Sequence, residues 1–260
     1  VFTPDAPGPY PVLLIRLPYD KERAQAYVYG QPDIYAARCY IVVVQDVRGQ
    51  YKSDGTFYTF RHEAEDGYDT IEWAAALPKS NGKVGMYGFS YPGATQWLPA
   101  TLRPPHLVAI APAMTASDYY EGWTYEHGAL NQAFAQDWPM SSLANSAVRR
   151  FADGEALDAG FNAARTAYLT RWATFLPLKR FPALHPDDRR VAPYHFDWLD
   201  HPSDDAYWRQ WSIRERWNQV TVPALNFDGW YDIFLNGAIE NFSGMRKHGG
   251  SAVARQGQRL

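Results

Sequence analysis

The residues with the clearest chemical potential are Ser90 and the glycines near it. An apolar run from Lys83 to Gly88 leads into the string Gly88-Phe89-Ser90-Tyr91-Pro92-Gly93, and a helix-compatible segment follows. A serine in a tight turn between a strand and a helix exposes its hydroxyl as a nucleophile, and small neighbours let the backbone turn sharply. Gly88 stands two residues before the serine. Pro92 occupies the place where a second glycine is usual, and Gly93 comes one place later.

The alternative for this segment is an ordinary glycine-rich turn that cradles a phosphate. Neither G-x-G-x-x-G nor G-x-x-x-x-G-K-[ST] is present here, and no lysine follows the glycines. These absences favour Ser90 as a nucleophile in a strand-to-helix elbow, the kind of turn found in α/β-hydrolase folds, over a phosphate-binding turn.

Such a serine needs an acid, a base and donors for the oxyanion that develops on the substrate. In this fold the order along the chain is Ser, Asp or Glu, His. Val222 to Asp228 predicts a later strand, so both Asp228 and Asp232 are candidate acids, although Asp232 could instead cap a helix predicted from Ile233. The backbone N–H of Tyr91 is one candidate oxyanion donor. The fold takes the second from the loop after the strand that ends at Leu17.

Several stretches resemble the CocE/NonD hydrolase family, which includes cocaine-esterase-like and X-Pro dipeptidyl-peptidase-like enzymes. They are Gly82 to Gly93 (GKVGMYGFSYPG), Leu17 to Lys21 (LPYDK), Gln45 to Gly49 (QDVRG) and Gly229 to Asp232 (GWYD), in the family's order over nearly the whole chain. The resemblance implies an α/β-hydrolase fold and a serine hydrolase. It also implies that Asp232 is the acid and that the phenol hydroxyl of Tyr19 is the second oxyanion donor, where a purely structural tyrosine is the alternative.

The base is not evident among the histidines. By the resemblance it follows the final strand, yet the one histidine after Asp232 is His248, in a segment typical of a helix C-terminus. We therefore expect the base, the β-sandwich domain of family members and two early strands to lie outside these residues, with His248 as the alternative base. The earlier histidines are expected to be surface, capping or packing residues: His62, His106, His127, His185, His195 and His201. No metal-ligand spacing such as H-E-x-x-H occurs, so neither a metal nor a cofactor is expected.

The elements that must position these residues are short strands alternating with helices. Apolar runs at 12–17, 40–45, 83–88 and 107–111 lack polar alternation, which predicts a parallel sheet covered on both faces. A helix is predicted from about Glu65 to Leu77, with acidic residues at its start and Pro78 at its end. Asp46 and Arg48, after the second strand, are interpreted as a structural ion-pair and turn element.

The pattern changes after residue 118. Strand signals vanish, helix-compatible stretches cover 142–151 and 155–175, and an irregular piece runs over 177–205. The sheet pattern resumes at 220–228, with a helix predicted over 233–247. We expect residues 1–118 and 217–260 to form the hydrolase core and residues 119–216 a helical cap. Four tryptophans are predicted to line its pocket: Trp123, Trp138, Trp172 and Trp230.

Composition narrows the function classes. The chain has 46% hydrophobic and 20% charged residues and a net charge of −3, so no basic excess would attract nucleic acid or an anionic membrane. No apolar run is long enough for a membrane span. The single cysteine, Cys39, excludes an internal disulfide, and we expect its thiol to be buried. Oligomeric state and compartment stay open, with the cytoplasm slightly favoured.

Three functions remain in view. The first is a serine hydrolase acting on a small ester or amide through an acyl-enzyme. An X-Pro dipeptidyl-peptidase would need carboxylates near the site to bind a free amine, and Ile233, Phe234 and Leu235 offer none, although Asp118 or Glu121 could serve. The third is a catalytically inactive, hydrolase-like binding module, which the missing histidine would favour.

Overall fold

The centre of the molecule is a parallel sheet, as the sequence predicts. The computed structural model describes residues 1–23, 30–148, 151, 153–184 and 191–260. Its four main strands lie in the order β2-β1-β3-β4, and every neighbouring pair is parallel. Their bounds are Tyr10–Leu17 (β1), Ile41–Asp46 (β2), Ser80–Phe89 (β3) and Leu107–Ala113 (β4).

Both edges of this sheet are extended by short backbone pairings. Next to β4, Ala224 and Phe227 form parallel bridges with Ile110 and Ala113, and Arg259 forms a further parallel bridge with Leu225. At the other edge, Phe2 pairs antiparallel with Val42 of β2. The strand predicted over 220–228 is therefore present as isolated bridges rather than as a regular strand.

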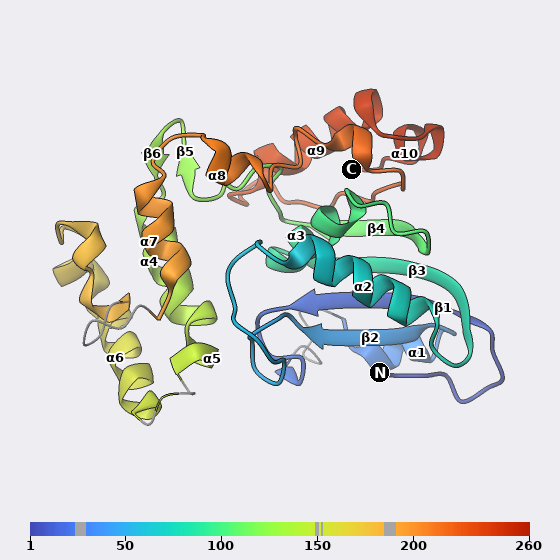
Figure 1. The fold of residues 1–260 in the computed structure, drawn as a ribbon, viewed down its shortest axis with the longest axis horizontal. Coiled ribbons are helices and arrows are strands. Elements are labelled where there is room, and N and C mark those ends of the chain that lie inside the picture. The colour runs from blue at the N-terminus through green and yellow to red at the C-terminus, as the bar shows by residue number, and fades with distance from the viewer. Residues whose placement is uncertain (24–29, 149–150, 152, 185–190) are drawn as a thin grey trace.

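Three helices cover the sheet, and their faces follow from the direction of each crossover. They are α1 (Pro32–Ala36), α2 (Glu63–Ala75) and α3 (Tyr91–Ala100). The β1–α1–β2 crossover runs toward one edge of the sheet, and the next two run toward the other. Since parallel crossovers are right-handed, α1 lies on the face opposite to α2 and α3. Figure 1 shows α2 and α3 side by side in front of the strands. All residues of α3 are buried, so the helix that follows Ser90 is the central one.

The described residues between 119 and 216 form mostly helices, beyond the ends of β1 and β2 at which the arrows point (Figure 1). The elements of this part are β5 (Tyr125–Glu126), β6 (Ala129–Leu130), α4 (Gln132–Trp138), α5 (Asn145–Val148), α6 (Gly154–Thr166), α7 (Pro193–Asp200) and α8 (Ala206–Arg209). Shorter π- or 3-10 turns cover Pro139–Leu143, Tyr168–Trp172, Leu178–Arg180, Pro182–Leu184 and, after α8, Trp217–Gln219. The chain then ends in α9 (Leu235–His248) and α10 (Ala252–Gln256). No described helix has the length and apolar character needed to cross a bilayer.

Three sequence expectations are wrong in detail. Residues 119–216 contain the β5–β6 pair, although no strand was predicted there. The stretch expected to be irregular contains α7, because Pro193 suits the start of a helix and Tyr194, Phe196 and Trp198 are buried. Cys39 is exposed rather than buried, since it lies in the turn between α1 and β2 with φ +66°.

The helix α7 carries a fully buried histidine, His195. Its Nδ1 lies 3.0 Å from the carbonyl oxygen of Ala135 in α4, which fits a neutral ring whose Nδ1–H donates. Its Nε2 has no hydrogen-bond partner among the described residues. Burial lowers the pKa of His195 to about 4, from an ordinary value of 6.5. Protonation of this ring therefore favours the unfolded chain.

We predict that His195 makes the protein less stable in acid. The unfolded chain takes up this proton below about pH 6.5 and the folded protein only near pH 4, so the stabilisation is full at neutral pH and is lost as the pH falls through this window. The difference between these two pKa values corresponds to a loss of about 3 kcal/mol in the free energy of unfolding. Chemical denaturation between pH 7 and 4.5 measures the loss. The His195→Gln variant should show a flatter pH dependence, and the exposed control His62→Gln should match the parent. Equal slopes for the parent and His195→Gln would contradict the prediction.

Candidate active site

Ser90 occupies a strained turn between β3 and α3. β3 ends at Phe89, α3 begins at Tyr91, and Ser90 has φ +64° and ψ −127°, a conformation that side-chain-bearing residues rarely adopt. Its N–H donates to the carbonyl oxygens of Ala113 (2.9 Å) and Met114 (3.1 Å) at the end of β4. Strain of this kind persists only where the surroundings enforce it, and it is the backbone signature of an elbow that presents a nucleophile.

Two glycines make this turn possible. Gly88 has φ +132°, and a Cβ atom added there would lie 2.6 Å from the Cβ of Pro92. A Cβ added to Gly93 would lie 2.6 Å from the side chain of Thr115. Both distances are too short for real atoms, so each position requires glycine. Gly93 thus supplies the second small residue of the elbow, one place after Pro92.

A buried polar network fixes the residue that follows Ser90. The Tyr91 hydroxyl donates to Oε1 of Glu63 (2.9 Å) and accepts a hydrogen bond from the N–H of Phe60 (2.9 Å). The other carboxylate oxygen of Glu63 forms an ion pair with Arg16 in β1 (2.8 Å). Burial raises the pKa of Tyr91 well above its ordinary value, with the nearby Glu63 carboxylate adding to the shift, so the phenol keeps its proton. The network ties α3 to β1 and α2.

Ser90 opens into a cleft of about 410 Å³. The residues that line it are Tyr19, Arg23, Tyr51, Phe89, Ser90, Phe134, Trp138, Ser141 and Ser142. The Tyr19 hydroxyl accepts a hydrogen bond from Nε1 of Trp138 (3.2 Å). Tyr91 is the first residue of α3, so its N–H lacks an intrahelical partner, and it makes no hydrogen bond to another described residue. Of the two donors predicted from the sequence, Tyr19 lines the cleft with Ser90, and the N–H of Tyr91 directly follows Ser90 in the chain.

The predicted acids follow the short pairing next to β4. Oδ1 of Asp228 accepts a hydrogen bond from the N–H of Gly229 (2.7 Å), and its buried Oδ2 has no partner among the described residues. Burial raises the pKa of Asp228 to about 6, and the nearby Asp232 adds to the shift. Asp232 is partly buried, and its Oδ1 accepts from the N–H of Phe234 (2.8 Å), just before α9. Neither carboxylate is among the described residues that line the Ser90 cleft.

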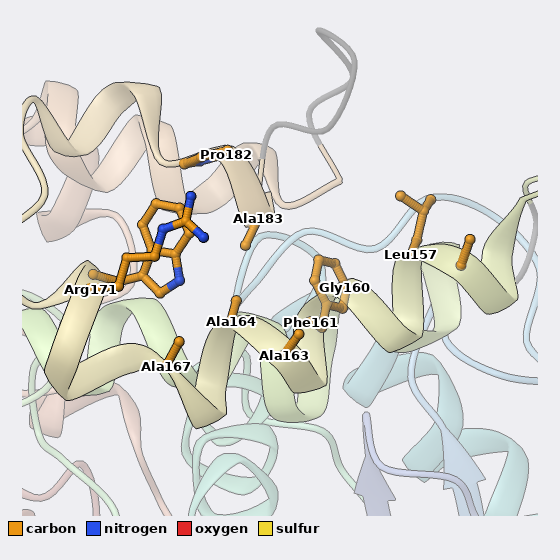
Figure 2. Close-up of a pocket in the computed structure, with 11 residues that line it drawn as sticks. Leu157, Gly160, Phe161, Ala163, Ala164, Ala167, Arg171, Pro182 and Ala183 are labelled. Atoms are coloured by element: carbon orange, nitrogen blue, oxygen red, sulfur yellow. The ribbon is translucent and has the colours of Figure 1, made fainter.

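The four tryptophans predicted to line the pocket lie in different parts of the structure. Trp138 lines the Ser90 cleft. Trp123 is fully buried and stacks on Phe234, with 4.4 Å between ring centroids. Trp172 lines a different pocket of about 340 Å³, between α6 and the turn at Pro182–Leu184 (Figure 2). Trp230 is 86% exposed. The structure therefore brings one of the four to the cleft with Ser90.

None of the described histidines lines this cleft. His106, His127 and His201 pair with carboxylates of Glu72, Glu121 and Asp205. His248, the alternative base, lies at the end of α9 with its ring stacked on Trp217. His62 precedes α2, His195 is buried between α7 and α4, and His185 lies outside the described residues. The described residues also contain no cluster of three side chains that could hold a metal ion.

Sequence reasoning missed several residues that shape the site. Arg16 is the one charge in the apolar run of β1, and this isolated charge was a readable sign of a buried ion pair. Asp46 and Arg48, interpreted as one ion-pair and turn element, form ion pairs with other residues instead: Asp46 with Lys21 (2.6 Å) and Arg48 with Asp66. Phe134, Ser141 and Ser142 carry no motif, and only their position in the folded chain reveals them.

Comparisons with known protein sequences show which family this chain matches. The sequence profile of the X-Pro dipeptidyl-peptidase (S15) family matches residues 1–258. Cocaine esterase of Rhodococcus sp. (strain MB1 Bresler) is 34% identical over 249 residues, which are 93% of this chain and 42% of the esterase. The chain therefore spans less than half the length of that relative.

Solved structures show the same architecture. A CocE/NonD family hydrolase from Staphylococcus aureus has a TM-score of 0.68 and 24% identity, covering 96% of this chain and 41% of its own. An α-amino acid ester hydrolase has a TM-score of 0.67 and 23% identity, covering 94% of this chain and 42% of its own. At these identities the similarity establishes the fold, which is that of the α/β-hydrolases.

A matched pair of glycine substitutions tests the geometry of the turn. We predict that Gly88→Ala destabilises the protein by about 2 to 3 kcal/mol, because it adds a clash with Pro92 to an unfavourable φ. Gly160 lies on the exposed side of α6, with open space around its missing Cβ, so Gly160→Ala should stabilise by about 0.5 to 1 kcal/mol. The free energies of unfolding in urea measure both changes. A Gly88→Ala variant as stable as the parent would contradict the proposed strain.

Proposed function

This chain belongs to the X-Pro dipeptidyl-peptidase (S15) family of hydrolases, and we propose that it supplies the nucleophile and the acid of a serine hydrolase that cleaves ester or amide bonds. The observation that carries the proposal is the backbone of Ser90. A serine at φ +64° between a strand and the central helix, open to a cleft, has the arrangement of a nucleophile elbow.

In the proposed reaction, the Ser90 hydroxyl oxygen attacks the substrate carbonyl carbon. A histidine base takes the hydroxyl proton and passes it to the leaving alcohol or amine as the acyl-enzyme forms. A water molecule then attacks the carbonyl carbon of the acyl-enzyme, with the histidine again taking and returning a proton. This step releases the carboxylic acid product and restores the Ser90 hydroxyl. The Tyr91 N–H and the Tyr19 hydroxyl would hold the negative oxygen of each tetrahedral intermediate, and such donors are often the largest single contribution to catalysis.

We assign the acid to Asp232 rather than Asp228. An acid that orients a histidine and stabilises its cation must be ionised at the working pH. Burial raises the pKa of Asp228 to about 6, so Asp228 would lose its charge on mild acidification, which favours Asp232 below about pH 6. The family resemblance of the segment Gly229 to Asp232 supports the same choice.

The base is proposed to be a histidine that is not among these 260 residues. None of the described histidines lines the Ser90 cleft, and His106, His127, His195, His201 and His248 contact other residues. Arg259 pairs in parallel with Leu225, shortly before Asp228. Residues that followed Arg259 would therefore emerge at the carboxyl ends of the strands, where Ser90 and Asp232 also lie.

We also propose that residues 119–216 act as a cap that shapes the substrate pocket. Two parts of the structure line the cleft: loops that follow strands of the sheet, and helix α4. Tyr19 and Ser90 come from the loops that follow β1 and β3, whereas Phe134 and Trp138 come from α4. The hydrogen bond between Trp138 and Tyr19 joins the two sides at the point where the oxyanion would sit.

Esters and acyl amides are favoured over X-Pro dipeptides as substrates. A dipeptidyl-peptidase must bind a free amine, and no carboxylate lines the cleft within the described part of the chain. Measuring hydrolysis of a Gly-Pro anilide against that of a short acyl ester separates the two. A hydrolase-like binding module remains the alternative of another class, and the lack of a described histidine at the cleft favours it.

Labelling by a fluorophosphonate tests the nucleophile. In the protein that carries these residues together with the segment after Leu260, we predict that the parent gains one adduct by intact mass. Ser90→Ala should gain none, and Ser141→Ala, which removes another serine of the same cleft, should label like the parent. An unlabelled, folded parent would favour the binding module. Labelling of residues 1–260 alone, once circular dichroism shows that they fold, would contradict the external base and point to His248.

A second prediction concerns the oxyanion donors. Tyr19→Phe should lower kcat by about 10² to 10³, the loss expected when one oxyanion donor is removed, with a smaller change in KM. Tyr51→Phe is the matched control, because Tyr51 lines the same cleft without a proposed role in the reaction. Steady-state kinetics on a neutral ester measures both variants. Equal kcat values for Tyr19→Phe and the parent would show that Tyr19 is a structural tyrosine.

A further inference from the structure

The charge of the Ser90 cleft is carried by one residue. Of its nine lining residues, Arg23 alone belongs to a charged residue type; the others are aromatic residues and serines. Residues 24–29, which follow Arg23 in the sequence, contain no acidic residue. Within the described residues, therefore, nothing that lines the cleft would repel an anion, and one group would attract it.

The Arg23 guanidinium is available for a ligand. Its neighbours in the same loop are engaged, since Lys21 forms an ion pair with the buried Asp46 and Glu22 pairs with Lys52. Arg23 has a looser contact, in which Nε lies 3.7 Å from Oδ2 of Asp20, and its side chain is 75% exposed. That separation exceeds a hydrogen bond, and the guanidinium makes no hydrogen bond to a described residue.

The rest of the lining fits a substrate with both an apolar and an anionic part. Phe89, Phe134 and Trp138 offer aromatic surface. Ser141 and Ser142 add hydroxyl groups at the same cleft, with 3.1 Å between their Oγ atoms. A guanidinium with nearby hydroxyls suits a carboxylate, because its planar set of N–H donors matches the two carboxylate oxygens.

We propose that this cleft selects ester or amide substrates that carry a carboxylate, and that Arg23 is the residue that recognises it. The proposal rests on the hydrolase function proposed above and adds a substrate class to it. Arg23 lies outside the groups assigned to bond cleavage, so it would change which substrate is preferred rather than the reaction itself. Because the side chain is mostly exposed, its effect should be moderate and should weaken as salt is added.

Two pairs of matched esters test the selection in the protein that carries the segment after Leu260. One pair places the carboxylate on the acyl side (the 4-nitrophenyl monoester of adipic acid against 4-nitrophenyl hexanoate). The other places it on the alcohol side (4-acetoxybenzoate against methyl 4-acetoxybenzoate). In at least one pair, Arg23→Gln should lower kcat/KM for the anionic ester about five-fold and leave the neutral ester unchanged. Arg23→Glu should lower it further, because attraction becomes repulsion.

Arg38→Gln is the control, since it removes the same charge from an exposed site between α1 and β2, at the other end of the sheet's strands. It should leave all four rates unchanged. If neutral esters are hydrolysed but Arg23→Gln changes neither anionic-to-neutral ratio, Arg23 does not select substrates, and the hydrolase function stands. If the folded parent hydrolyses none of the four esters and resists the fluorophosphonate, the proposed function itself fails.

Discussion

The backbone conformation of Ser90 is the constraint on which the rest of the site depends. A residue with a side chain does not rest at φ +64° unless its surroundings hold it there. Here the strand β3 enters the turn, the fully buried helix α3 leaves it, and the Ser90 N–H is held by two carbonyl groups at the end of β4. The glycines at 88 and 93 remove the atoms that would prevent this approach. The strain is thus supported by β3, by the end of β4 and by the buried helix α3.

The buried network of Arg16, Glu63 and Tyr91 extends that support to β1 and α2. A buried ion pair adds little net stability, because desolvation of both charges offsets their attraction. Breaking the pair is costly, however. Loss of one partner would leave the other charge buried and unpaired, which would destabilise the fold by about 3 to 5 kcal/mol. The pair therefore holds Tyr91, and with it the N–H at the start of α3, in one position relative to β1, the strand that precedes Tyr19. This gives a physical reason for a full charge in the middle of the apolar strand β1.

The cleft itself is a product of long-range contact. Tyr19 and Trp138 are 119 residues apart, and their hydrogen bond joins the loop after β1 to helix α4. The same helix is held to α7 by the buried His195, so the packing of the helices beyond the sheet determines where Phe134 and Trp138 stand relative to Ser90. A change in that packing would alter the shape of the pocket without touching the elbow. The shape of the cleft can therefore vary while the elbow at Ser90 stays the same.

The sequence by itself determined what depends on near neighbours. Continuous apolar runs predicted the parallel strands, the acidic start and apolar face predicted α2, and the glycine spacing around Ser90 predicted a sharp turn there, because each rests on residues within a few positions of one another. Only the tertiary structure decided that Trp138 reaches the cleft while Trp172 and Trp230 do not, and that Arg23 lines the same cleft as Ser90. Those outcomes depend on which distant surfaces pack together. Trp138, for example, reaches the cleft through contact with Tyr19, 119 residues away, and no local pattern encodes such a contact.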